Sequence, residues 1–399
     1  MRRMNAVAVL DAVRTASSST LRVADLAALT GLSRPAVTRA LATLTEHGLV
    51  ETAPEAPEAA GAVGRPAQHV RFRAGVGHVA GIDIGPHKVL VMVADLAGEV
   101  RAARRVAISP GTDGPRLFDT VRTALDDAVA EAGITPGDLW AVSVGTPGVV
   151  DPARGEVLLA PSIPGWAGLP VVPRLRDWLN CPVLIDNDVD LAVLGERWRG
   201  AATGADSVVF VQWGERIGAG IVIGGTPHRG ASNAAGELGF VRLQPGTPTA
   251  APAARSADRL GPDELGPFER LAGAAAIRGM AREAGVALGD GGDTAPLFDA
   301  ARDGDPEAVA VVEQAAARFA HGLSVLVLLL DPGLVVIGGG LSRAGETLLE
   351  PVRRHLQHLT LVPANVRASA LGDSAVAVGA LRRALTASEA RLTEPITEA

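Results

Sequence analysis

The sequence predicts an N-terminal winged helix-turn-helix in residues 1–73, followed by an α/β body of two lobes. Three observations lead to this prediction. Three short helical patterns separated by glycine turns open the chain, and strand and helix patterns alternate from residue 77 onward. The strand-turn-strand pattern of residues 81–100 is also repeated in residues 207–225. Such a repeat indicates a duplicated fold with a cleft between two lobes.

The composition is that of a soluble globular protein. The chain has 399 residues, of which 47% are apolar and 20% charged, enough for two or three domains. A single cysteine, Cys181, excludes a disulfide framework and a multi-cysteine zinc site. The longest apolar run, residues 323–330, is far shorter than the ~20 residues of a membrane span. We therefore expect a cytoplasmic protein without membrane contact.

Charge is distributed unevenly along the chain. Residues 1–73 contain nine arginines against six acidic residues, whereas the whole chain has a net charge of −7. A mildly basic head on an acidic body predicts that nucleic acid binds at one end only.

The third helical pattern, residues 33–48, has the properties of a recognition helix. Ser33 is a good N-cap, Pro35 is tolerated in the first turn, and Gly48 ends the helix. Residues of the polar face suit contacts with phosphates and base edges: Ser33, Arg34, Thr38, Arg39 and Thr43. A glycine turn at Gly31 separates this helix from the one before it, as in a helix-turn-helix.

A wing is expected after the recognition helix. The segments "GLVET" (48–52) and "HVRFR" (69–73) alternate like strands and enclose a long tip rich in alanine, proline and glutamate. Arg65 in this tip is placed to enter a minor groove. The competing interpretation is a small helical bundle with solvated arginines. Helix order, turn, wing and charge together favour DNA binding.

Three further segments complete the body. Residues 141–157 read as a strand followed by a glycine turn and a hairpin, and residues 181–198 as a buried strand running into a helix. Residues 331–352 read as a strand, three glycines and a helix.

Eight motifs carry a family resemblance when taken in order. They are "GIDIG" (81–85), "GTPGVVDPARG" (145–155), "IPGWAGLPV" (163–171), "DNDVDLAVLGE" (186–196), "GAGIVIGG" (218–225), "NAAGELG" (233–239), "VVIGGGLSRAG" (335–345) and "LGDSAVAVGALRRAL" (371–385). From about residue 5 to 386 the chain resembles the transcriptional regulators of the ROK family. The resemblance implies an actin/hexokinase-like body of two RNase-H-like lobes, residues 77–190 with 372–387 and residues 191–371. Sugar and, in the kinases, ATP bind between these lobes.

The resemblance also implies a set of site residues. Asp188 matches the catalytic base of the kinases, and the matching sugar contacts are Asn187, Glu237 and Glu269, with Gly165 in the substrate rim. The competing interpretation of Asp188 is an ordinary N-cap of the helix that begins there.

The phosphate loops depart from the kinase pattern. Asp83, which would hold Mg²⁺ in a kinase, is retained, but Pro86 and His87 replace the usual Gly-Thr. Proline has no amide hydrogen to donate to a phosphate. In the second loop, Glu215 adds a negative charge where phosphate would bind. We interpret the "DIGPHK" turn as the relic of a phosphate loop, and we expect no ATP cofactor unless the protein is a kinase.

A structural zinc ion is not expected. Many family members place a histidine and three cysteines after "GELG". This chain has Phe240 instead of the histidine, and residues 245–267 contain no cysteine or histidine. We expect Cys181 to be a buried small side chain and predict no metal site.

Three functional hypotheses follow. The first is a sugar-responsive DNA-binding regulator, a repressor of carbohydrate-metabolism genes, whose effector is a sugar or sugar phosphate. It would bind a pseudo-palindromic operator as a dimer or tetramer. The second is an ATP-dependent sugar kinase with a DNA-binding head, using Asp188 and Asp83. The third is a regulator that reads a partner protein or a phosphosugar through a non-functional cleft.

Overall fold

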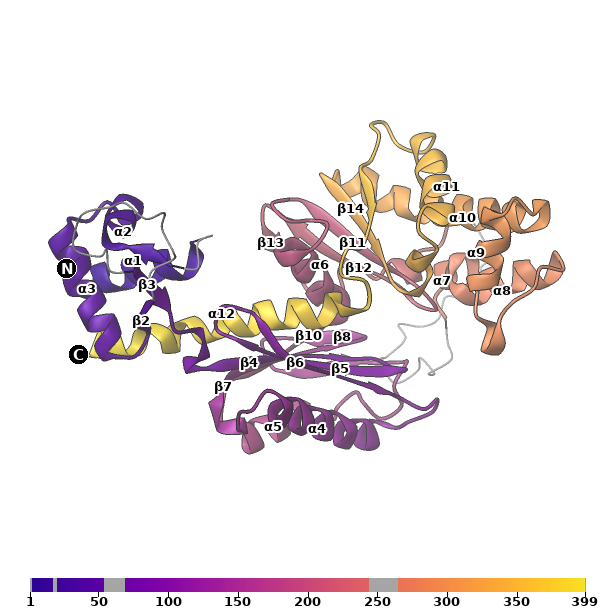
Figure 1. Cartoon of the computed structure of the whole chain (residues 1–399). Coiled ribbons are helices and arrows are strands. Elements are labelled where there is room, and N and C mark those ends of the chain that lie inside the picture. Colours follow the sequence, from indigo (N-terminus) through magenta and orange to yellow (C-terminus); the bar gives the residue numbers. More distant parts are fainter. Residues whose placement is uncertain (1, 17–19, 54–68, 244–264, 399) are drawn as a thin grey trace.

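The computed structural model describes residues 2–16, 20–53, 69–243 and 265–398. It consists of a small N-terminal domain and two α/β lobes that share two central helices (Figure 1). The fold class predicted from the sequence is confirmed.

The N-terminal domain is a winged helix-turn-helix. Its elements are α1 (Arg2–Thr15), β1 (Leu21–Arg22), α2 (Val23–Thr30), α3 (Arg34–Glu46), β2 (Val50–Ala53) and β3 (His69–Phe72). Gly31 ends α2 with a φ of 69°, a left-handed conformation that favours glycine, and Ser33 is the N-cap residue of α3. The two-residue strand β1, which the sequence did not predict, pairs with β3 and completes a three-stranded sheet in the order β1-β3-β2. Arg65 lies outside the described residues.

The first lobe is built on a five-stranded sheet in the order β10-β7-β4-β5-β6. Its strands are β4 (His78–Ile84), β5 (Lys88–Asp95), β6 (Val100–Ala107), β7 (Leu139–Thr146) and β10 (Val183–Asn187). Helices α4 (Gly114–Glu131) and α5 (Val171–Leu179) cover one face, and the hairpin of β8 (Val149–Asp151) and β9 (Glu156–Leu159) extends from the sheet (Figure 1). The amphipathic pattern of α4 buries its apolar side chains against this sheet.

The second lobe repeats this arrangement. Its sheet has the order β13-β12-β11-β14-β15, so both sheets run third-second-first-fourth-fifth in chain order. The strands are β11 (Val208–Trp213), β12 (Ile217–Ile223), β13 (Thr226–Pro227), β14 (Leu334–Gly338) and β15 (Val366–Ala368). The helices are α7 (Pro267–Ala272), α8 (Ala274–Glu283), α9 (Ala295–Arg302), α10 (Pro306–Leu330) and α11 (Glu346–Gln357). The predicted duplication is therefore confirmed.

Short 3₁₀ helices connect several of these elements. They are η1 (Ala74–Val76), η2 (Pro136–Asp138), η3 (Leu238–Phe240), η5 (Asp290–Gly292), η6 (Gly340–Ala344) and η7 (Gly372–Ser374).

Two helices, α6 (Asp188–Arg199) and α12 (Ala375–Glu398), lie between the sheets (Figure 1). Their backbones are in close contact, because a Cβ atom added at Gly379 would lie 1.8 Å from the Leu191 carbonyl oxygen. One added at Gly195 would lie 2.3 Å from the carbonyl oxygen of Ala375. The helices therefore pack at glycine contacts that no larger residue fits.

The distal part of α12 reaches the N-terminal domain (Figure 1). Leu385 and Leu392 belong to the same buried cluster as Val9 and Leu10 of α1. Arg14 of α1 also lies 3.8 Å from the Glu389 carboxylate. The helix thus continues beyond residue 387 and joins the N-terminal domain to the body.

Helix α10 has the length and composition of a membrane span, but much of it is buried inside the protein. Of its most apolar 18-residue window, 56% is buried in the protein. Side chains such as Val312, Phe319 and Leu323 form part of the core of the second lobe. Helix α10 is a core helix in this structure.

Candidate functional site

A cavity of about 470 Å³ lies between the two lobes. Asn187, Asp188, Glu237 and Glu269 all line it, although they are far apart in the sequence. The structure thus brings together four of the five sugar contacts implied by the family resemblance. The volume is in the range of small-molecule sites.

Gly165 is not among the residues that line the cavity, so this predicted rim residue is not brought to the site. Its loop is held elsewhere: Trp166 is fully buried and donates a hydrogen bond to the Thr146 hydroxyl at 2.8 Å. The amide of Gly114, at the start of α4, donates to the carbonyl of Pro164 at 2.8 Å. The neighbouring residues Pro161 and Ser162 form the rim instead.

Asp188 is the first residue of α6, and Asn187 is the N-cap. The Asn187 side-chain oxygen accepts the Val189 amide at 2.9 Å, and its Nδ2 donates to the Gly148 carbonyl at 2.6 Å. The interpretation of Asp188 as the N-cap residue is therefore wrong, because its neighbour fills that position. Although Asp188 also accepts the Val189 amide, at 2.9 Å, its carboxylate lines the cavity.

Several carboxylates are crowded at this end of the cavity. Burial and the nearby Asp83 carboxylate raise the pKa of Asp188 from 3.8 to about 6. Burial, followed by the charges of Asp188 and Glu269, raises the pKa of Glu237 from 4.5 to about 7. Near neutral pH Asp188 is therefore mainly an ionised acceptor, whereas Glu237 is partly protonated and can donate as well as accept, a combination that suits the hydroxyl groups of a sugar.

Glu269 connects three segments of the second lobe. Only 3% of it is exposed, and its carboxylate accepts the Ile217 amide at 3.0 Å and the Gly266 amide at 2.6 Å. Arg216 lies 3.4 Å from the same carboxylate. These bonds fix the orientation of Glu269, and the remaining lone pairs are available to a ligand.

The first phosphate turn is internally bonded. The Asp83 carboxylate lies 2.8 Å from the Lys88 ammonium group, which also donates to the Asp373 carbonyl at 2.6 Å. The Gly85 amide donates to the Lys88 carbonyl at 2.8 Å, and Pro86 has no amide hydrogen. Burial raises the pKa of Asp83. This turn offers a phosphate fewer donors than a turn without proline, so Mg-ATP fits it poorly.

The second loop contains an ion pair that the sequence did not predict. Glu215 pairs with Arg278, so the negative charge expected there has a cationic partner. Two more arginines at the cavity are also paired, Arg216 with Glu269 and Arg343 with Asp373 at 2.6 Å. All three arginines that line the cavity have carboxylate partners.

Among the described residues, no group of three or more histidine, cysteine or acidic side chains is placed to hold a metal ion. Phe240, at the position of the family histidine, lines the cavity and is 39% exposed. A phenyl ring cannot ligate zinc, so the donor set on this side of the cavity does not fit the zinc site of the family. Cys181 is buried, as expected, and burial raises its pKa to about 11.

The predicted DNA-binding surface lies on α3. Ser33, Arg34, Thr38 and Arg39 are exposed, and Thr43 is half-buried. The hydroxyl groups of Thr38 and Thr43 donate to backbone carbonyls one turn earlier, at 3.0 and 3.3 Å. The opposite face of α3, with Val37, Leu41 and Leu44, is buried. The two arginines are thus the long cationic side chains that this face presents to DNA.

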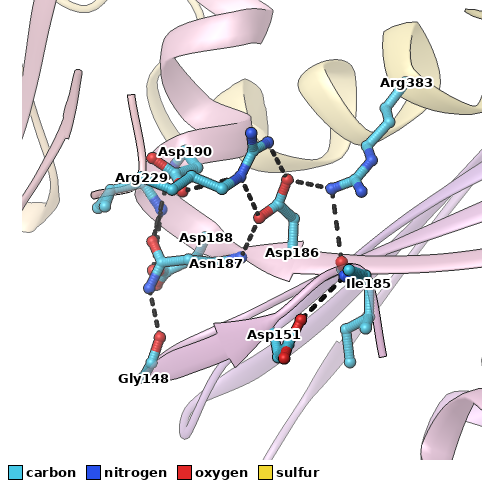
Figure 2. A network of polar contacts seen from close by, with 11 residues as sticks. Gly148, Asp151, Ile185, Asp186, Asn187, Asp188, Asp190, Arg229 and Arg383 are labelled. Carbon is cyan, nitrogen blue, oxygen red and sulfur yellow. Dashed lines mark hydrogen bonds and ion pairs between the residues drawn. The ribbon is translucent and has the colours of Figure 1, made fainter. Parts of the chain in front are cut away.

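An ion-pair network behind Asp188 was not predicted from the sequence. Asp186 is 1% exposed and pairs with Arg229, at 2.5 Å, and with Arg383 of α12 (Figure 2). Asp190 lies 3.6 Å from Arg229. Asp186 and Asp190 belong to a quoted motif, but no local pattern marks their distant arginine partners.

These features define a class of protein: a winged helix-turn-helix DNA-binding domain joined to a two-lobe body with the cleft of a sugar kinase. The ROK family pattern matches residues 79–387, and an IclR helix-turn-helix domain pattern matches residues 4–54. The chain belongs to the ROK family and is one of its transcriptional regulators.

Relatives include both enzymes and repressors. A glucokinase of Halalkalibacterium halodurans is 30% identical over 75% of this chain and 92% of its own length. A putative xylose repressor of a Caldicellulosiruptor species is 27% identical over 76% of this chain and 77% of its own length.

Solved structures that share the fold also include a kinase and a regulator. A ROK glucokinase of Streptomyces griseus in complex with glucose and AMPPNP is 31% identical, with a TM-score of 0.65, over 77% of this chain and 99% of its own. A ROK transcriptional regulator described as a homologue of the E. coli MLC protein covers 100% of this chain and 99% of its own, with a TM-score of 0.73. At 20% identity, the latter shows that the whole fold, DNA-binding domain included, is shared.

Proposed function

We propose that this protein is a sugar-responsive transcriptional repressor of carbohydrate-metabolism genes. One observation carries the proposal: a single chain joins an exposed recognition helix to a cavity faced by carboxyl and amide groups. Relatives of similar body sequence include proteins named xylose repressors. The winged helix binds operator DNA in the cytoplasm, and the cavity binds the effector.

The effector that fits the cavity best is an uncharged sugar. Burial raises the pKa of both Asp188 and Glu237, and nearby carboxylates raise them further, Asp83 for Asp188 and Asp188 for Glu237, so this end of the cavity disfavours added negative charge. The three arginines at the cavity are already paired with carboxylates, so a sugar phosphate would have to displace those partners. Neutral hydroxyl groups, in contrast, bind the carboxyl groups without added charge.

Effector binding would act by selecting one arrangement of the lobes. A ligand that contacts both lobes favours the conformation in which both sets of contacts are made. In a symmetric dimer or tetramer, this changes the spacing of paired winged helices relative to the two halves of a pseudo-palindromic operator. The repressor needs neither zinc nor Mg-ATP in this scheme.

The second candidate is an ATP-dependent sugar kinase with a DNA-binding head. The carboxylate of Asp188 at the cavity and the 30% identity to a glucokinase favour it. Asp188 would take the proton from the attacking hydroxyl, and Mg-ATP would supply the phosphoryl group. Pro86 and the pairing of Asp83 with Lys88 oppose it, because they leave the phosphate end poor in free donors.

A thermal-shift panel of common sugars, their phosphates and Mg-ATP tests the proposal. A ligand at 100 times its Kd adds about 2.7 kcal/mol to the folded state, a shift that is easily measured. We expect stabilisation by one or a few neutral sugars and none by Mg-ATP. Stabilisation by Mg-ATP with a sugar would instead favour the kinase, and a response to sugar phosphates alone would overturn the neutral effector.

A further inference from the structure

The Asp186 carboxylate lies where three separate parts of the chain meet. It is the penultimate residue of strand β10, directly before Asn187, and its Oδ1 accepts the Asn187 backbone amide at 3.1 Å. On its other sides it pairs with Arg229 and Arg383 (Figure 2). At 1% exposure, it depends on these two arginines for compensation of its charge.

Arg229 connects Asp186 to the wall of the cavity. It begins the loop that follows β13, in which Asn233, Gly236 and Glu237 line the cavity. The loop is closed on itself, because the Ala235 amide donates to the Arg229 carbonyl at 3.0 Å. A ligand that moves Glu237 therefore also moves the residue that holds Asp186.

Arg383 connects Asp186 to the DNA-binding domain. It lies on α12, where it also donates to the Ile185 carbonyl at 3.4 Å. Two turns further along this helix, Arg391 packs over the ring of Trp140 at 4.6 Å. Leu392, fully buried, belongs to the cluster that includes the core of α1.

Helix α12 packs closely against the elements of the body around it. Besides the contacts with α6, a Cβ atom at Gly81 of β4 would lie 2.4 Å from the Ala377 carbonyl oxygen of α12. Backbones this close cannot slide independently without losing packing. A displacement of α12 in the body is therefore transmitted along a stiff helix to α1.

From this arrangement we infer that Arg383 is the positioning residue that couples effector binding to DNA binding. Asp186 is shared between the loop of the effector cavity and the helix that carries the winged domain. Closure of the lobes changes the Arg229 contact, and Asp186 passes the change to Arg383 and α12. The inference rests on the proposed function, since it concerns how that function is regulated.

The test compares coupling factors in the full-length protein. Operator affinity is measured by fluorescence anisotropy with and without a saturating neutral sugar, in wild type and in Arg383→Met. Allosteric coupling typically changes affinity about 5- to 150-fold, and we expect such a factor in wild type. In Arg383→Met, we expect both ligands to bind within about twofold of wild type while the coupling factor falls to within about twofold of one.

Two variants distinguish coupling from a general structural effect. Arg382→Met alters an exposed arginine next to Arg383 on the same helix and should keep the full coupling factor. Arg383→Lys retains the charge and should restore part of the coupling. If Arg383→Met does not fold, Arg229→Met interrupts the same connection from the cavity side and should uncouple as well.

The outcomes separate this inference from the proposed function. If the coupling factor in Arg383→Met equals that of wild type, or if Arg382→Met loses as much, the inference is wrong and the proposed function stands. If no sugar changes operator affinity in wild type, both are wrong.

Discussion

Replacing Asp188 by asparagine should stabilise the body of the protein while weakening sugar binding. The pKa of Asp188 rises from 3.8 to about 6 in the folded state, chiefly because burial disfavours its charge. A rise of this size corresponds to roughly 3 kcal/mol of stability lost when the group ionises. Asparagine has nearly the same shape, and its side-chain oxygen can still accept the Val189 amide now bonded at 2.9 Å.

The sign of the effect follows from proton linkage. Between pH 4 and 6 the folded state binds more protons at Asp188 than the unfolded state does, so stability falls as the pH rises through this window. The asparagine side chain that replaces Asp188 does not titrate. The gain from Asp188→Asn should therefore be greatest above pH 6, up to about 3 kcal/mol, and fall to about half that value by pH 5.

Thermal unfolding at pH 8 and pH 5 measures the gain, which should appear as several degrees in the Tm of the body at pH 8. Sugar affinity should fall about tenfold or more, because a charged acceptor is replaced by a neutral amide. Asp186→Asn is the matched control with the opposite sign: it removes the carboxylate that Arg229 and Arg383 share, leaves Arg229 only the more distant Asp190, and should destabilise the fold by about 3–5 kcal/mol. A gain for Asp188→Asn that does not depend on pH, or no gain at all, would refute the reasoning.

Three further predictions concern other parts of the molecule. Arg39→Ala should weaken operator binding by about 1–3 kcal/mol at fixed salt with sugar affinity unchanged, as measured by anisotropy and calorimetry; equal loss of both would contradict separate sites. Leu392→Ala should lower the free energy of unfolding by about 2–5 kcal/mol and make the N-terminal domain melt separately in scanning calorimetry. A single unshifted transition would show that packing on α12 does not stabilise this domain. Sugar affinity should increase from pH 5 to pH 8 as Asp188 and Glu237 ionise, and an affinity that is flat across this range would mean that neither carboxylate contacts the sugar.

Local patterns predicted the secondary structure well where periodicity and turn residues agree. The hairpin β4-β5, the strand-to-helix unit around Asp188 and the recognition helix α3 were all predicted from the sequence. The short strand β1 was not, because two residues carry no periodicity and form a strand only through pairing with β3.

The candidate site was predicted only in part. The family motifs identified Asp188 and Glu237, but the pairing of Glu215 with Arg278 joins residues 63 positions apart and has no local signature. The same holds for Asp186 and Arg383, which are 197 positions apart. Such ion pairs depend on how the lobes and α12 pack, so a sequence pattern shows each charge without its partner.

The central claim is that a neutral sugar bound in the cavity changes the affinity of the DNA-binding domain for its operator. The sugar itself is not phosphorylated. The most direct measurement uses a DNA fragment selected by the protein from a random library, with operator anisotropy and ADP release followed in one sample containing sugar and Mg-ATP. We predict that one neutral sugar lowers operator affinity by about fivefold or more and that no ADP forms above the protein-free background. Sugar-dependent ADP formation with unchanged operator affinity would contradict the account.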